Sequence, residues 1–214
     1  MAEHPARLHP WLPLAIALLA GAPRFAAGQG APADSVIYRL IPASRLEVKT
    51  GKAGLFGFAG HGHLIRAHVV AGRVALYPGA VSRSHLELAV PSDSLEVLTP
   101  PDTAEIRKVT EAMRSEVLHV EQFPEIAFAS KEVTPTHGGY HLVVALTLAG
   151  VTRDVPIDAL VETTGDTLRA RGTFSVKQTD FGIRPYRGGP AGTVKVADRV
   201  TFDFDAIGVS GERQ

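Results

Sequence analysis

The segment 194–207 alternates between apolar and polar side chains with a period of two, and this pattern constrains the fold more than any other feature of the sequence. Its apolar positions are Val200, Phe202 and Phe204, and the positions between them are Thr201, Asp203 and Asp205. Successive side chains of a β-strand point to opposite faces. The pattern therefore predicts a strand with an apolar inward face and an acidic outward face.

Runs of similar character recur along the chain, rich in Val, Leu, Ile, Phe and Thr and punctuated by 21 glycines and 15 prolines. The predicted strands are 36–41, 45–50, 64–77, 85–90, 125–133, 140–149, 151–162, 167–177 and 194–207. The first two form a pair around the turn at Pro42, and Gly72 predicts a bulge or a barrel bend within 64–77.

Strand 167–177 repeats the alternation, with Leu168, Phe174 and Val176 inward and basic residues between them. About eight consecutive strands with hairpin-length links predict an all-β antiparallel fold, either a barrel or a sandwich. Periodicity does not choose between these two architectures.

One helix is predicted, over residues 102–116, directly after Pro100 and Pro101. Its apolar positions recur at helical spacing and are Ile106, Val109, Met113 and Val117. We expect this stripe to pack against the β-structure, with the helix as a lid over one end, rather than to form a partner-binding face.

Composition excludes several classes of function. The formal net charge is zero, so the chain has no overall basic character of the kind that drives nucleic-acid binding. There is no cysteine, which excludes disulfides, thiolate metal sites and cysteine nucleophiles. No motif assembles a nucleophile, a base and an orienting group, so we expect neither a catalytic site nor a cofactor.

The first 28 residues differ from the rest and predict a secretory signal peptide. Arg7 supplies a positive charge, and 11–20 form an apolar run that is shorter than the ~20 residues of a membrane span. Small residues at 26–28 predict cleavage before Gln29, with Ala22 as the weaker alternative. We expect a signal peptide at 1–28, a linker at 29–34, the domain at 35–208, a tail at 209–214, and a periplasmic or secreted protein that does not span the membrane.

Several segments, in order, resemble the YceI-like family of lipid- or polyisoprenoid-binding proteins. They are FPEIAFAS at 123–130, LTLAGVTRDV at 146–155, Phe174 with QTDFGI at 178–183, and VADRV at 196–200. The resemblance extends from Tyr38 to about Ile207. It implies an eight-stranded antiparallel lipocalin-like barrel whose interior holds one slender apolar ligand.

The N-terminal third departs from the better-known members of that family. Residues 55–65 read LFGFAGHGHLI, where those members carry an Arg-His-Leu-Gly type motif, and this resembles a branch with a divergent motif. Position 149 is alanine, where a histidine is commoner.

The resemblance implies a quinone or a polyprenyl compound as the ligand. Phe174, Phe202 and Phe204 are assigned inward from alternation, and family position and local pattern add Phe56, Phe58, Phe128 and Phe181. A second hypothesis places a polar headgroup at the loop 184–189, where Arg184 and Arg187 flank Tyr186. Side chains that fill the barrel, whose outside then binds a protein, are the competing interpretation. The sequence does not specify an oligomeric state.

His61 and His63 are the strongest candidates for a different chemistry. Residues two apart on a strand share a face, so the two imidazoles could supply half of a metal site in a metal-binding barrel or a small metal-dependent enzyme. Loop hydrogen bonds or a place in the cavity wall are the simpler interpretation, because no third and fourth ligands are evident.

Overall fold

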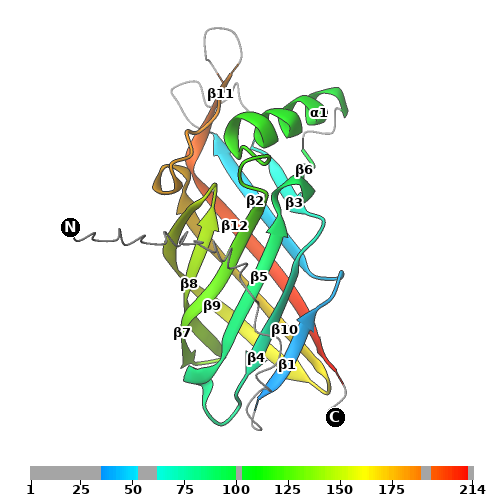
Figure 1. Cartoon of the computed structure of the whole chain (residues 1–214), viewed down its shortest axis with the longest axis vertical. Coiled ribbons are helices and arrows are strands. Elements are labelled where there is room, and N and C mark those ends of the chain that lie inside the picture. The colour runs from blue at the N-terminus through cyan, green and yellow to red at the C-terminus, as the bar shows by residue number, and fades with distance from the viewer. Residues whose placement is uncertain (1–34, 53–61, 100–102, 189–193, 212–214) are drawn as a thin grey trace, which may run out of the picture. The chain divides into compact units, whose positions relative to one another are not determined.

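The computed structural model describes residues 35–52, 62–99, 103–188 and 194–211. These residues form a closed antiparallel β-barrel with one short helix (Figure 1). The strands are β1 Val36–Leu40, β2 Arg45–Lys52, β3 Leu64–Ala67, β4 Ala71–Leu76, β5 His85–Pro91, β6 Leu95–Val97, β7 Glu125–Thr136, β8 Gly139–Leu148, β9 Val151–Thr164, β10 Thr167–Lys177, β11 Arg187–Gly188 and β12 Val194–Ser210. The barrel that the family resemblance implies is therefore confirmed, and a sandwich is excluded.

The barrel has eight strand positions, here called staves. Three of these staves each consist of two short strands that follow one another along the barrel. β1 and β2 both run antiparallel to β12, β3 and β4 form the next stave, and β5 and β6 the third. Single long strands, β7, β8, β9, β10 and β12, complete the ring. Closure between the first and last staves is made by Tyr38 opposite Ser210 and by Leu46 opposite Phe204.

Two expectations for the first third of the barrel are wrong. β1 and β2 both pair with β12 and not with each other. The turn at Pro42 does not reverse the chain, so the two strands follow one another along β12 in the same stave. The run 64–77 is two strands that separate at 68–70, where the amide of His68 donates to the carbonyl of Ser94 (3.2 Å). Gly72 lies inside β4 instead of interrupting the run, and a β-carbon there would lie 2.4 Å from the carbonyl oxygen of Glu87.

The predicted helix forms α1, Thr103–Ala112, and continues as a π-helical turn over Met113–Val117. Met113 is buried in the barrel core, and Val109 and Val117 pack against the same core. The apolar stripe thus serves packing, as expected, and α1 lies at one end of the barrel (Figure 1). No helix within the described ranges is long and apolar enough to cross a bilayer.

Inward and outward faces follow the alternation in the sequence. Leu168, Val176, Val200 and Phe202 are buried in the core. The acidic face of β12 is more covered than alternation predicts: the side chain of Asp205 is only 17% exposed, because the guanidinium of Arg169 pairs with it at 2.5 Å.

Candidate ligand-binding site

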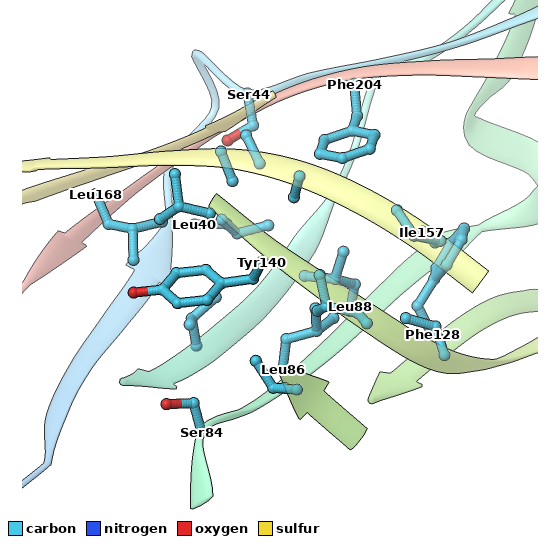
Figure 2. A pocket seen from close by; sticks show the side chains of 18 of the residues that line it. Leu40, Ser44, Ser84, Leu86, Leu88, Phe128, Tyr140, Ile157, Leu168 and Phe204 are labelled. Carbon is cyan, nitrogen blue, oxygen red and sulfur yellow. The ribbon is translucent and has the colours of Figure 1, made fainter. Parts of the chain in front are cut away.

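The main cavity lies inside the barrel, enclosed by inward side chains of nearly every stave (Figure 2). Its free volume is about 130 Å³. The wall is built from leucine, valine, isoleucine, alanine and phenylalanine side chains, and it includes Leu86 and Leu88 of β5, Phe128 of β7, Ile157 of β9 and Phe204 of β12. Such a surface favours apolar groups and offers almost no hydrogen bonds to water.

Polar atoms of the main cavity gather at one side of it (Figure 2). The Ser44 hydroxyl donates to the carbonyl of Ile207 (3.0 Å), and the Ser84 hydroxyl accepts the amide of Tyr77 (3.0 Å). Tyr140 points its ring into the cavity, with the hydroxyl toward the side where Leu168 and Ser84 lie. Within the described residues this hydroxyl has no hydrogen-bond partner, so it is available to a ligand oxygen.

A second, helix-side cavity of about 80 Å³ lies between the barrel wall and the segment that follows α1. Met113, Val117 and Leu118 line it from that segment. Leu46 and Phe128 belong to the walls of both cavities. The two spaces are therefore consecutive along the barrel and are divided by side chains.

The size of the main cavity limits what enters without movement. Ligand pockets usually have about 300–1,000 Å³, and a dry apolar cavity of about 150 Å³ accepts a ring the size of benzene. At about 130 Å³, the main cavity accommodates one ring or a short branched unit as it stands. A longer chain must displace Leu46 or Phe128 and continue into the helix-side cavity.

Within the described ranges, the predicted lining phenylalanines are divided among the main cavity, the helix-side cavity and the core. Phe128, Phe174 and Phe204 line the main cavity, and Phe202 lines the helix-side cavity. Phe181 is buried in the core and belongs to neither wall.

The remaining predicted site residues lie away from these cavities or outside the described ranges. Arg184 and Arg187 are exposed and line neither cavity. Phe56, Phe58 and His61 lie outside the described residues.

His63 makes a loop contact of the kind considered in the simpler interpretation of the histidine pair. Its Nδ1 lies 2.7 Å from the carbonyl oxygen of Thr99, and because a carbonyl only accepts, Nδ1 donates here. In the part of the chain that the structure describes, no group of three or more histidine, aspartate or glutamate side chains is arranged to hold a metal.

Tyr140 is the functional candidate that the sequence did not reveal. Its position at the start of a strand gives it no distinctive motif, since tyrosine is a common strand residue. The available signal was a tyrosine at an inward position, where alternation predicts aliphatic residues, because its hydroxyl normally finds a hydrogen-bond partner when it is buried, and Tyr140 is only half-buried.

Charges surround the barrel wall outside the cavities. Glu47 is 4% exposed and accepts from Arg66 at 2.6 Å and from Arg45 at 3.3 Å. The hydrogen bond from Arg169 lowers the pKa of the Asp205 carboxyl, although burial acts in the opposite direction. Of the residues in these pairs only Arg45 also belongs to the wall of the main cavity, which is otherwise without a charged pair.

Comparison with known proteins agrees with this architecture. The family model of the YceI-like domain matches residues 44–207. BcnA of Burkholderia cenocepacia superposes with a TM-score of 0.62 at 16% identity, covering 77% of this chain and 95% of that one. No curated protein matches the sequence.

Two further solved structures share the fold. A polyisoprenoid binding domain from Saccharophagus degradans, implicated in plant cell wall breakdown, has a TM-score of 0.60 at 14% identity, over 82% of this chain and 99% of that one. A YceI protein of Campylobacter jejuni has a TM-score of 0.53 at 12% identity, over 70% and 85% of the two chains.

Proposed function

Because this chain belongs to the YceI-like family, we propose that it binds an apolar lipid of isoprenoid type, a quinone or a polyprenyl compound, inside its barrel, and that its role is binding rather than catalysis. The observation that carries this proposal is the apolar main cavity inside the barrel, with the hydroxyl of Tyr140 at its side, which has no hydrogen-bond partner among the described residues. Burial of each methylene in such a space contributes about 0.8 kcal/mol.

The proposed ligand has an oxygen at one end and a branched hydrocarbon chain. The oxygen accepts a hydrogen bond from Tyr140, and the first part of the chain fills the space beside Leu86 and Leu88. The rest of the chain passes Phe128 and Leu46 into the helix-side cavity. This orientation satisfies the hydroxyl and buries only hydrocarbon against hydrocarbon.

The polyisoprenoid binding domain with the same fold supports this ligand class by its name. At 14% identity the likeness concerns the fold, so the choice of ligand rests on the chemistry of the cavity.

We also propose that residues 1–28 direct export and are removed, which would place the domain in the periplasm or outside the cell. A charged start, an apolar run and small residues before Gln29 support this proposal. N-terminal sequencing of exported protein is expected to begin at Gln29, and a mature chain that begins at Met1 contradicts this route.

Native mass spectrometry of the protein purified without detergent tests the ligand proposal. The expected spectrum contains a bound species whose mass, after release by solvent, identifies an isoprenoid lipid. A bound metal ion would instead favour the metal-binding alternative. A bare chain that also fails to take up added isoprenoids would mean that side chains alone fill the barrel.

A further inference from the structure

Five basic side chains gather at the end of the barrel where α1 lies. They come from the end of β10, from the connection that follows it, from β11 and from the start of β12 (Figure 1). These residues, here called the basic face, are Lys177, Arg184, Arg187, Lys195 and Arg199. All five are exposed, and within the described ranges none forms an ion pair.

Four members of the basic face stand opposite one another as like charges. Lys177 of β10 is the register partner of Arg199 of β12, and Arg187 of β11 is the register partner of Lys195 of β12. Like charges directly opposite on neighbouring strands destabilise a sheet. Two such pairs on the same strand, β12, are an unfavourable arrangement for folding alone.

Like charges stand opposite one another elsewhere on the barrel wall too, with Arg39 opposite Arg73 and Glu47 opposite Asp203, but each of these two pairs includes a residue with a partner of opposite charge close by. Arg73 pairs with Glu87 across β4 and β5 at 2.9 Å, and Lys131 pairs with Asp154 at 2.7 Å. Arg73 therefore has a carboxylate partner beside the opposed Arg39, whereas no cation of the basic face forms an ion pair within the described ranges. The basic face therefore carries cations without ion pairs in a chain whose formal net charge is zero.

Carboxylates near the basic face offset only part of its charge: hydrogen bonds from Thr179, and beyond these the charge of Lys177, lower the pKa of Asp198. Asp198 accepts from the amide of Thr179 at 2.9 Å and from its hydroxyl at 2.8 Å, so this carboxylate is committed to the turn after β10. Asp180 is the other acidic residue of this turn. Tyr186 is 36% exposed beside the cations, and such an amphipathic ring is suited to a boundary between water and lipid.

We propose that the basic face docks the helix end of the barrel onto an anionic lipid membrane. Phosphate groups of the lipid headgroups would lie between the opposed cations and remove their mutual repulsion, and Tyr186 would lie at headgroup depth. This inference rests on the placement of charge and is independent of the ligand in the barrel.

The test is sedimentation of the full-length mature chain with vesicles of phosphatidylcholine alone and of phosphatidylcholine mixed with phosphatidylglycerol. We expect binding only to the anionic vesicles, weakened by salt because surface charges are screened. The variant Lys177→Gln/Arg187→Gln/Lys195→Gln/Arg199→Gln is expected to lose about fivefold in affinity per residue changed.

A matched variant removes the same number of charges elsewhere. Arg39→Gln/Arg73→Gln/Lys131→Gln/Arg153→Gln changes exposed cations of the other strands and is expected to bind anionic vesicles like the unaltered protein. Thermal unfolding supplies a second readout: the basic-face variant should melt higher than wild type, because two like-charge pairs are gone. The matched variant also removes the opposed charges of Arg39 and Arg73 but loses the ion pairs of Arg73 with Glu87 and of Lys131 with Asp154, so it should not melt higher.

Three results would overturn the proposal. They are equal loss of vesicle binding in both variants, no binding of the wild type to anionic vesicles at low salt, and binding to a DNA oligonucleotide or to heparin without binding to vesicles. The last result would assign the basic face to a polyanion instead of a membrane.

Discussion

Phe174 and Phe202 stack with their ring centroids 4.7 Å apart and their planes within 6° of parallel. They are register partners on β10 and β12. Phe174 lines the main cavity and Phe202 lines the helix-side cavity, so the stacked pair lies at the division between the two. One interaction therefore contributes both to the core and to the separation of the two spaces.

Shortening Phe202 should connect these spaces at a cost in stability. Phe202→Ala removes a ring that is 4% exposed, and the loss is expected to be about 3–5 kcal/mol in the free energy of unfolding, measured by urea denaturation. The same variant should bind longer isoprenoids better relative to short ones. Phe202→Leu is the control, with a smaller loss and little change in length preference. An unchanged length preference in the alanine variant would mean that the two cavities do not act as one channel.

Tail length should determine affinity in the unaltered protein. Each isoprene unit contributes about 3 kcal/mol before ordering costs, until the available space is filled. Because the main cavity has only about 130 Å³, we expect affinity to rise over the first units, level off where Leu46 and Phe128 must move, and rise again if the chain enters the helix-side cavity. Fluorescence quenching over a series of tail lengths measures this, and a flat response contradicts cavity binding.

Phe128→Arg and Phe174→Arg should weaken this binding and also lower stability. Each places a long charged side chain in an apolar wall where no described carboxylate lines the cavity. Binding of the same lipid series and urea denaturation are the measurements. If affinity survives in variants that remain folded, the phenylalanines form core and not ligand surface.

Glu47 offers a test of the charged outer wall. Glu47→Gln leaves Arg66 and Arg45 without their buried carboxylate partner, and we expect a loss of about 1–3 kcal/mol in unfolding free energy by urea denaturation. Glu87→Gln is the matched change at an exposed pair with Arg73 and should alter stability by less than about 0.5 kcal/mol. Equal effects of the two substitutions would show that burial of Glu47 adds nothing.

The sequence predicts the long strands well, and it predicts poorly the barrel positions that are made of two short strands. β10 begins and ends where the alternation of Leu168, Phe174 and Val176 predicts, because one face of that strand is buried along its length. The run 64–77 is rich in strand formers apart from Gly72, yet it divides at 68–70, where pairing with β6 gives way to pairing with β5. Local strand propensity does not indicate which strands will pair by hydrogen bonds.

The candidate site is predictable only in outline. Alternation identifies Phe174 and Phe204 as inward, and both line the main cavity. Whether an inward side chain borders free space or solid core depends on packing between distant strands, which is why Phe181 and Phe204 differ although both are aromatic and inward. The position of Tyr140 against β9 and the opposition of Lys177 and Arg199 depend on register, which the sequence does not state.

Acid should weaken the barrel partly through Asp205. Its pKa is lowered in the folded protein, first by the hydrogen bond from Arg169, whereas an unfolded aspartate titrates near about 3.9. The folded state then binds fewer protons, so this stabilisation is complete above the unfolded pKa and is lost as the pH falls through the lower folded one. Asp205→Asn should flatten the dependence of the urea midpoint on pH below about 4, whereas Asp93→Asn, an exposed control without a described ion pair, should leave its slope unchanged.

Tyr140 supplies the sharpest test of how a ligand is oriented. Tyr140→Phe removes one hydroxyl that has no partner among the described residues and keeps the ring that lines the main cavity, so stability should change little. A neutral hydrogen bond contributes about 0.5–1.5 kcal/mol, which corresponds to a loss of about two- to twelvefold in affinity. The loss should appear for an isoprenoid alcohol or a quinone and be absent for a pure isoprenoid hydrocarbon of equal length, because only the former accept from the hydroxyl. Equal affinities of wild type and variant for both ligands would place the oxygen elsewhere and reverse the proposed orientation.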